Sequence, residues 1–154
     1  MTTTTLDRLE KMGIDLPEPG TAAAKYVPWV QTGNLIFTSG QLPLKNGTLT
    51  ATGLLGRDLD TTEGREVARW CAINVLAQLR DALGDLDRVK RLVKITVFVA
   101  GADGFTDHHL VANGASELLA EAFAERGQHA RSAVGMAALP LNAPVEVEAI
   151  VEID

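Results

Sequence analysis

The chain has little cysteine, few aromatic residues and no excess of basic charge. Its one cysteine, Cys71, cannot form an internal disulfide, which is typical of a protein in a reducing compartment. Aromatic residues make up only 5% of the 154 residues, too few for stacking platforms that bind single-stranded RNA. The formal net charge is −6, whereas a nucleic-acid-binding protein normally carries a broad positive footprint. We therefore expect a cytoplasmic protein with no nucleic-acid partner.

Long apolar runs and several familiar motifs are also absent. No apolar stretch approaches the roughly 20 residues that span a bilayer, and the N-terminus lacks the features of a secretory signal. There is no G-x-x-x-x-G-K-[ST] loop, no G-x-G-x-x-G turn and no G-x-S-x-G elbow. His108 and His109 are adjacent on a predicted helix, so they point about 100° apart and share no metal-binding face. We expect no membrane partner, no metal and no cofactor.

The apolar pattern that is present predicts strands and helices of one α+β domain. Strands are predicted at about 25–31, 35–39, 92–100, 131–138 and 145–153, and the strand at 92–100 is apolar enough to be buried on both faces or nearly so. A short helix at 6–12, with Thr5 as its N-cap, precedes a PEPG turn, and residues 45–60 are predicted as loop.

Two long helices complete the pattern. The first follows the Asp60 and Glu63 capping pair and ends at about Leu83, and its apolar stripe includes Cys71, which is predicted to be buried and inert. The second spans about 106–126. This order predicts a mixed sheet with two helices on one face. We expect an N-terminal extension with a short helix over residues 1–24 and a single domain over 25–154.

Arg131 opens a strand whose other residues on the same face are small. Ala133, Gly135 and Ala137 share that face by the two-residue period, which leaves space beside the guanidinium. A guanidinium is a planar fork of donors that matches a carboxylate and stays charged when partly buried. From these residues alone, a ligand anchor and a structural arginine paired with Asp or Glu are equally open. His129, two residues earlier, is predicted to lie in a surface loop.

Glu146 and Glu148 lie on the polar face of the last strand, where either could hold or deprotonate a water. If 131–138 and 145–153 paired as a simple hairpin, Arg131 and Glu146 would lie roughly 20 Å apart at ~3.3 Å per residue. Such a hairpin cannot bring both into one site. We expect either that the two strands are not direct neighbours or that the two residues meet across a subunit interface.

Several segments together resemble one protein family. They are YV…GNLIFTSGQLP (26–43), VKITVFV (93–99), the helix carrying Asn113, HARSAVGMAALP (129–140) and PVEVEAIVEI (144–153). In this order and spacing the sequence resembles the Rid family of reactive-intermediate (enamine/imine) deaminases, often labelled endoribonuclease L-PSP-like. The resemblance implies a chorismate-mutase-like α+β fold and a homotrimer with three sites in the clefts between subunits.

The resemblance also implies roles for individual residues. In deaminating members the arginine of the A-R-S motif binds the substrate carboxylate, and the first glutamate of the last strand positions the attacking water; here these are Arg131 and Glu146. The other substrate-binding positions correspond to Tyr26, Ser39, Gly40, Asn113 and Ala133. No metal or organic cofactor is implied. Ala133 stands where deaminases often have cysteine, and Ala24-Lys25 replaces the usual Gly-Pro before the tyrosine, which together with the longer N-terminus indicates a divergent subgroup.

Three functions follow as hypotheses. The first is hydrolysis of enamine or imine intermediates that bear a carboxylate, of the 2-aminoacrylate type, to a 2-keto acid and ammonia. The second is a non-catalytic trimeric protein that binds or senses a small carboxylate metabolite at Arg131. The third is a ribonuclease, suggested by the family's label, which fits poorly with the net charge of −6.

Overall fold

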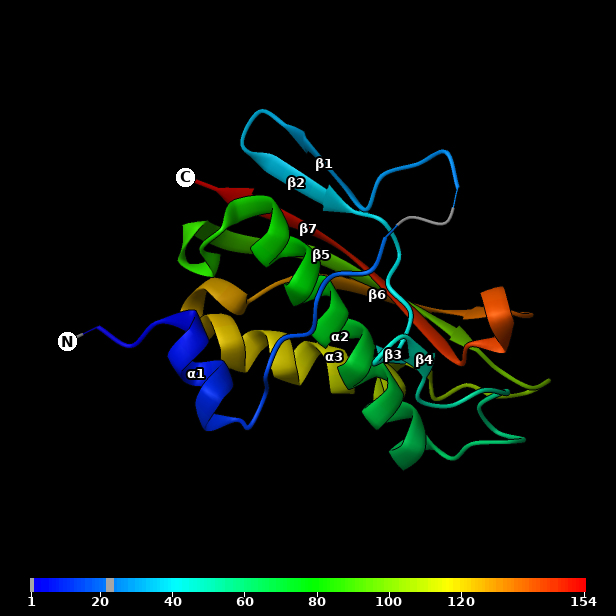
Figure 1. The fold of residues 1–154 in the computed structure, drawn as a ribbon. Coiled ribbons are helices and arrows are strands. Elements are labelled where there is room, and N and C mark those ends of the chain that lie inside the picture. The colour runs from blue at the N-terminus through cyan, green and yellow to red at the C-terminus, as the bar shows by residue number, and fades with distance from the viewer. Residues whose placement is uncertain (1, 22–23) are drawn as a thin grey trace.

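A mixed five-stranded sheet with two long helices on one face forms the centre of the protein, as predicted (Figure 1). The computed structural model describes residues 2–21 and 24–154, so Met1, Ala22 and Ala23 of the predicted extension lie outside the described residues. The strands follow the order β1-β2-β7-β5-β6, in which only β5 and β6 run parallel. Their bounds are β1 Trp29–Thr32, β2 Leu35–Thr38, β5 Val89–Ala100, β6 Ala130–Met136 and β7 Val145–Ile153.

The central strand β5 is buried on one face only, and this differs from the prediction. Ile95, Val97 and Val99 are fully buried against the helices. Thr96 and Phe98, which point the other way, are only half-buried because no helix covers that face. We call the uncovered side the open face of the sheet.

The helix α2, Thr61–Leu83, begins and ends as its sequence predicts. The backbone N–H of Glu63 donates to Asp60 at 2.8 Å, and the backbone N–H of Asp60 donates to Glu63 at 3.1 Å, which completes the capping box. Gly84 ends the helix with a φ of 75°. Cys71 is fully buried within it, which confirms the predicted burial, and burial raises the pKa of its thiol well above the ordinary value.

The helix α3, His108–Phe123, is shorter than predicted because Ala124 adopts a φ of 56° and a 3₁₀ turn, Ala124–Gly127, follows. It packs closely against α2. A Cβ on Gly114 would lie 2.0 Å from the carbonyl oxygen of Arg65, so only glycine permits this approach of the two backbones.

The predicted loop 45–60 contains a small hairpin. β3, Leu44–Lys45, pairs with β4, Thr48–Leu49, around Asn46 and Gly47, whose φ values of 54° and 77° suit a two-residue hairpin turn. Its strands are too short for a periodic signal. β1 also starts later than predicted, at Trp29, directly after Pro28.

The N-terminal segment packs on the two long helices (Figure 1). In α1, Thr5–Lys11, Leu9 is buried, and Arg8 donates to the carbonyl of Ala122 on α3 at 2.8 Å. Thr4, rather than the predicted Thr5, is the N-cap, because Thr5 is buried and donates to Asp87 at 2.7 Å. In the described residues, no helix is long and apolar enough to cross a membrane.

Candidate functional site: two half-sites on opposite faces of the sheet

The strands that carry Arg131 and Glu146 are not neighbours, because β5 lies between β6 and β7. This confirms the first of the two arrangements predicted. Arg131 pairs with Ile95, which points at the helices, whereas Glu146 pairs with Phe98, which points to the open face. The two positions are also separated by roughly 10 Å along the strands and ~10 Å across them. One protomer therefore holds these residues in two separate half-sites.

The first half-site is centred on Arg131 and faces α3. Its Nη1 donates to Asn113 Oδ1 at 2.8 Å and to Ser116 Oγ at 3.2 Å. Its Nη2 donates to the carbonyl oxygen of His109 at 3.3 Å. The predicted Arg131 and Asn113 are thus brought together, and Ala133 lies two residues along the same face, partly packed against the core.

The guanidinium of Arg131 keeps free donors. All three partners described above are neutral, and among the described residues no carboxylate lies within ion-pair distance of it. A guanidinium has five N–H donors. Those three hydrogen bonds leave the Nε–H and one Nη2–H, enough to bind one carboxylate bidentately. The structural ion pair that the sequence left open is not found in the described part of the chain.

The second half-site is a cavity of about 390 Å³ at the edge of the sheet. Four of the predicted residues line it, Tyr26, Ser39, Gly40 and Glu146, together with Gln41, Gln78 and Leu141. The segment after β2 runs beside β7, where Gln41 and Val147 exchange backbone hydrogen bonds of 2.7 and 3.0 Å. This pairing brings the T-S-G motif next to Glu146.

The carboxyl group of Glu146 is half-buried, and burial raises its pKa above the ordinary value, with the nearby Glu148 charge acting in the same direction. Gly40 makes room for it. A Cβ at Gly40 would lie 2.7 Å from Glu146 Cδ and 2.9 Å from each carboxyl oxygen. The missing side chain at position 40 therefore sets where this carboxylate sits.

Replacing Gly40 with alanine is expected to push the Glu146 carboxylate aside while leaving the fold intact, because the clash is with the end of a flexible side chain. We expect the turnover of any substrate that depends on Glu146 to fall about tenfold, with a change in unfolding free energy of at most ~1 kcal/mol. Gly20→Ala is the matched control, since Gly20 lines the same cavity and its added Cβ meets no atom of the described residues within 4 Å. Equal turnover in both variants would show that the position of Glu146 does not matter.

Three residues near the half-sites were not predicted. Gln78 lies on the cavity wall with 1% exposure, and its Oε1 has no hydrogen-bond partner among the described residues. Ser116 contacts Arg131 from the helical position three after Asn113. His129 is not a free surface residue, since its Nε2 lies 2.9 Å from Ser116 Oγ and its Nδ1 lies 2.7 Å from the Gly127 carbonyl oxygen. Two sequence signals were available. Gln78 is a polar residue inside the apolar run INVLAQL, and Ser116 follows Asn113 at the i, i+3 spacing that places both on one side of a helix.

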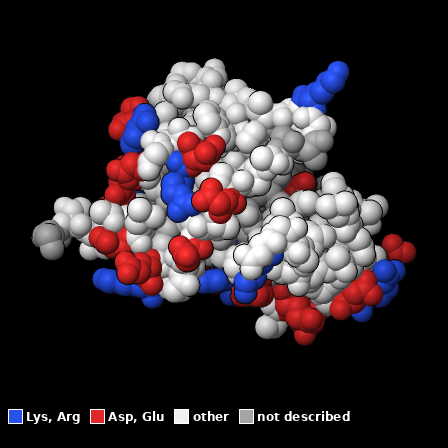
Figure 2. Space-filling view, viewed as in Figure 1, with Lys and Arg blue, Asp and Glu red and all other residues white. Residues whose placement is uncertain are grey.

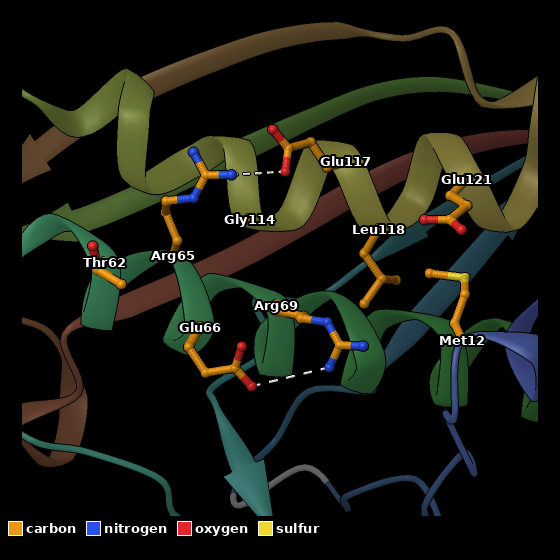
Figure 3. A pocket seen from close by; sticks show the side chains of 9 residues that line it. All are labelled: Met12, Thr62, Arg65, Glu66, Arg69, Gly114, Glu117, Leu118 and Glu121. Atoms are coloured by element: carbon orange, nitrogen blue, oxygen red, sulfur yellow. Dashed lines mark hydrogen bonds and ion pairs between the residues drawn. The ribbon is translucent and has the colours of Figure 1, made fainter.

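Another groove lies between α2 and α3 (Figure 3). It encloses about 500 Å³ and contains none of the predicted site residues. Both arginines in its lining pair with glutamates, Arg65 with Glu117 at 2.8 Å and Arg69 with Glu66 at 4.0 Å. Acidic and basic side chains are likewise interspersed over the face of the molecule that carries α1 and α2 (Figure 2). No group of three or more His, Cys, Asp or Glu residues in the described ranges could hold a metal ion.

The fold is that of a known class of small α+β protein. A family model described as "YjgF/chorismate mutase-like, putative endoribonuclease" matches residues 6–153. The chain therefore belongs to the YjgF/chorismate mutase-like family, which includes the Rid and L-PSP proteins, and the predicted family and fold are confirmed.

Individual relatives cover almost the whole chain. Protein TCP17 of Trypanosoma cruzi is 49% identical over 147 residues, which are 95% of this chain and 92% of that protein. The crystal structure of Atu1372, a protein with unknown function from Agrobacterium tumefaciens, matches with a TM-score of 0.92 and 49% identity over 97% of this chain and 92% of that chain. The crystal structure of E. coli TdcF with bound serine matches with a TM-score of 0.63 and 27% identity over 92% of this chain and 97% of that chain.

Proposed function

We propose that this protein hydrolyses reactive enamine or imine intermediates that carry a carboxylate. An enamine such as 2-aminoacrylate tautomerises to 2-iminopropanoate, and one water adds across the C=N bond, so that a 2-keto acid and ammonia leave. Imine hydrolysis is intrinsically easy, and an anchored carboxylate with an oriented water is sufficient assistance. The observation that carries the proposal is the pair of donors on Arg131 that its three hydrogen bonds leave over, since its partners among the described residues are all neutral.

Each residue has a defined task in this proposal. Arg131 binds the substrate carboxylate through its Nε–H and the remaining Nη2–H, and Asn113 keeps the guanidinium in place. Glu146 accepts a proton from the water that attacks the imine carbon. Tyr26, Ser39 and Gly40 form the wall around that water. TdcF, whose crystal structure contains serine, supports a small amino-acid-like ligand for this family.

We propose further that two copies of the chain complete each site. The open face carries an apolar row of Val30, Phe37 and Ile150, and Val30 and Phe37 are exposed. Exposed apolar rows of this kind mark protein–protein contacts. A second copy placed on this face would supply Arg131 to the cavity that holds Glu146. The resemblance to the Rid proteins implies that the assembly is a trimer. We also propose that the protein is cytoplasmic.

The ionisation of Glu146 gives a test by pH. The carboxylate form is the active one, and because burial and Glu148 raise its pKa, activity should fall on acidification at a pH above the ordinary glutamate value. Glu148→Gln removes the neighbouring charge, so we expect the acid limb of the kcat profile to move to lower pH. Glu152→Gln, farther along the same strand, is the control and should leave the limb in place. An acid limb that moves equally in both variants would contradict the assignment to Glu146.

The function itself is tested by generating 2-aminoacrylate with a separate enzyme and following its disappearance. We expect the wild-type protein to accelerate its loss above the spontaneous rate. Tight binding of a 2-keto acid without acceleration would favour the carboxylate-binding protein. Cleavage of RNA without any acceleration of 2-aminoacrylate loss would favour the ribonuclease. Either result would overturn the hydrolase proposal.

A further inference from the structure

A hydrogen-bonded chain connects Arg131 to the loop before β6. Arg131 Nη1 donates to Ser116 Oγ at 3.2 Å, and Ser116 Oγ lies 2.9 Å from His129 Nε2. The other ring nitrogen, His129 Nδ1, lies 2.7 Å from the carbonyl oxygen of Gly127. The imidazole is half-buried, and it spans the gap between α3 and the strand that carries Arg131.

For a neutral imidazole, the direction of each hydrogen bond in this network follows from the Gly127 carbonyl. A carbonyl oxygen can only accept, so His129 Nδ1 carries the proton. In the neutral imidazole Nε2 is then an acceptor, and the Ser116 hydroxyl must donate to it. The lone pairs of Ser116 Oγ remain for the N–H of Arg131. A neutral His129 thus fixes the rotation of the Ser116 hydroxyl, which in turn presents an acceptor to the guanidinium.

We propose that His129 and Ser116 are positioning residues that hold the Arg131 guanidinium with its unpaired donors turned toward the substrate carboxylate. This inference rests on the proposed role of Arg131 as the carboxylate anchor. Asn113 and Ser116 take the two protons of Nη1, and the His109 carbonyl takes one of Nη2. The three contacts fix the plane of the guanidinium, which lowers the entropy lost when the carboxylate binds.

This hydrogen-bond network requires an acceptor at the position of His129 Nε2. Substitutions can distinguish the loss of that acceptor from the loss of the packing that the imidazole ring provides. His129→Gln can place its amide oxygen close to that position, whereas His129→Ala removes it. Ser116→Ala breaks the same chain one step closer to Arg131. Because both residues act through one path, His129→Ala should have little further effect once Ser116 is alanine.

The first measurement follows the arginine itself and needs no substrate. In NMR spectra, the Arg131 Nε–H signal is identified as the one lost in Arg131→Lys. We expect its exchange with water to quicken about tenfold in Ser116→Ala, in His129→Ala and in the double variant alike, and to stay near wild type in His129→Gln. Additive effects, or an unchanged exchange rate in the single variants, would overturn the inference.

The second measurement uses two probes, pyruvate and its uncharged amide pyruvamide. Ser116→Ala and His129→Ala should weaken pyruvate binding about tenfold, leave pyruvamide binding unchanged, and raise KM with little change in kcat. Equal weakening for both probes would indicate a general structural role and contradict the inference. If the wild-type protein binds no 2-keto acid, the proposed function fails, while the exchange measurement still decides whether His129 and Ser116 order Arg131.

Discussion

Replacing Arg131 with alanine is expected to lower kcat/KM for a carboxylate-bearing imine by about 100- to 1000-fold. The bidentate pair between a guanidinium and a carboxylate is charge-assisted on both sides, and its loss costs roughly 2–5 kcal/mol in a site shielded from water. Lysine at this position keeps the charge but not the planar fork, so Arg131→Lys should recover only part of the loss. Stopped-flow or coupled assays of 2-aminoacrylate decay measure the effect.

The fold should survive the Arg131 substitution. Arg131 makes its three hydrogen bonds to neutral groups at a half-buried position, so we expect a loss of only ~1 kcal/mol in unfolding free energy. Arg65→Ala is the matched control, because Arg65 pairs with Glu117 on the outer surface of the helices. Activity of Arg131→Ala within about threefold of the Arg65→Ala control would remove Arg131 from the site.

Placing a glutamate at Phe37 should break the proposed oligomer and with it the proposed activity. Phe37 is 40% exposed in the single chain and lies in the middle of the apolar row on the open face. An unpaired charge buried at a subunit contact costs about 3–5 kcal/mol, which weakens association at least ~100-fold. Light scattering coupled to gel filtration should therefore show monomers, and these should have lost activity although Arg131 and Glu146 are unchanged.

The control for Phe37→Glu is Leu6→Glu, at a residue of similar exposure, 48%, in the first turn of α1 and away from the sheet. This variant should keep the oligomer and the activity. A Phe37→Glu monomer that retains full activity would mean that one protomer contains a complete site.

Local sequence signals predicted the elements that local interactions determine. The Asp60 and Glu63 pair located the start of α2 because a capping box involves only neighbouring residues. The end of α3 was wrong by three residues because it depends on the positive φ of Ala124, which the sequence does not reveal. β5 was predicted to be buried on both faces or nearly so, because its sequence is almost continuously apolar. An apolar sequence does not show what covers each face of the strand.

Arg131 and Glu146 were singled out from the strand pattern and the other residues of the candidate site by resemblance, whereas the strand that separates the two was not identified in advance. Arg131 and Asn113, both predicted to bind the substrate, are hydrogen-bonded, and Tyr26, Ser39, Gly40 and Glu146 share a cavity. Their separation into two half-sites follows from the insertion of β5 between β6 and β7, a pairing between strands far apart in the chain. The hydrogen bonds from Ser116 to Arg131 and His129 were missed. They join α3 to the residues around the start of β6, which are not neighbours in the sequence.

The most direct test of the split site is complementation between two inactive variants. Arg131→Ala and Glu146→Gln should each be inactive alone. When the two chains are co-expressed and assemble at random, each mixed trimer should contain one site with both residues intact, so about a quarter of wild-type activity should return. Native mass spectrometry confirms that mixed trimers are present. Mixed trimers that form and remain inactive would contradict a site shared between subunits, as would full activity in an isolated wild-type protomer.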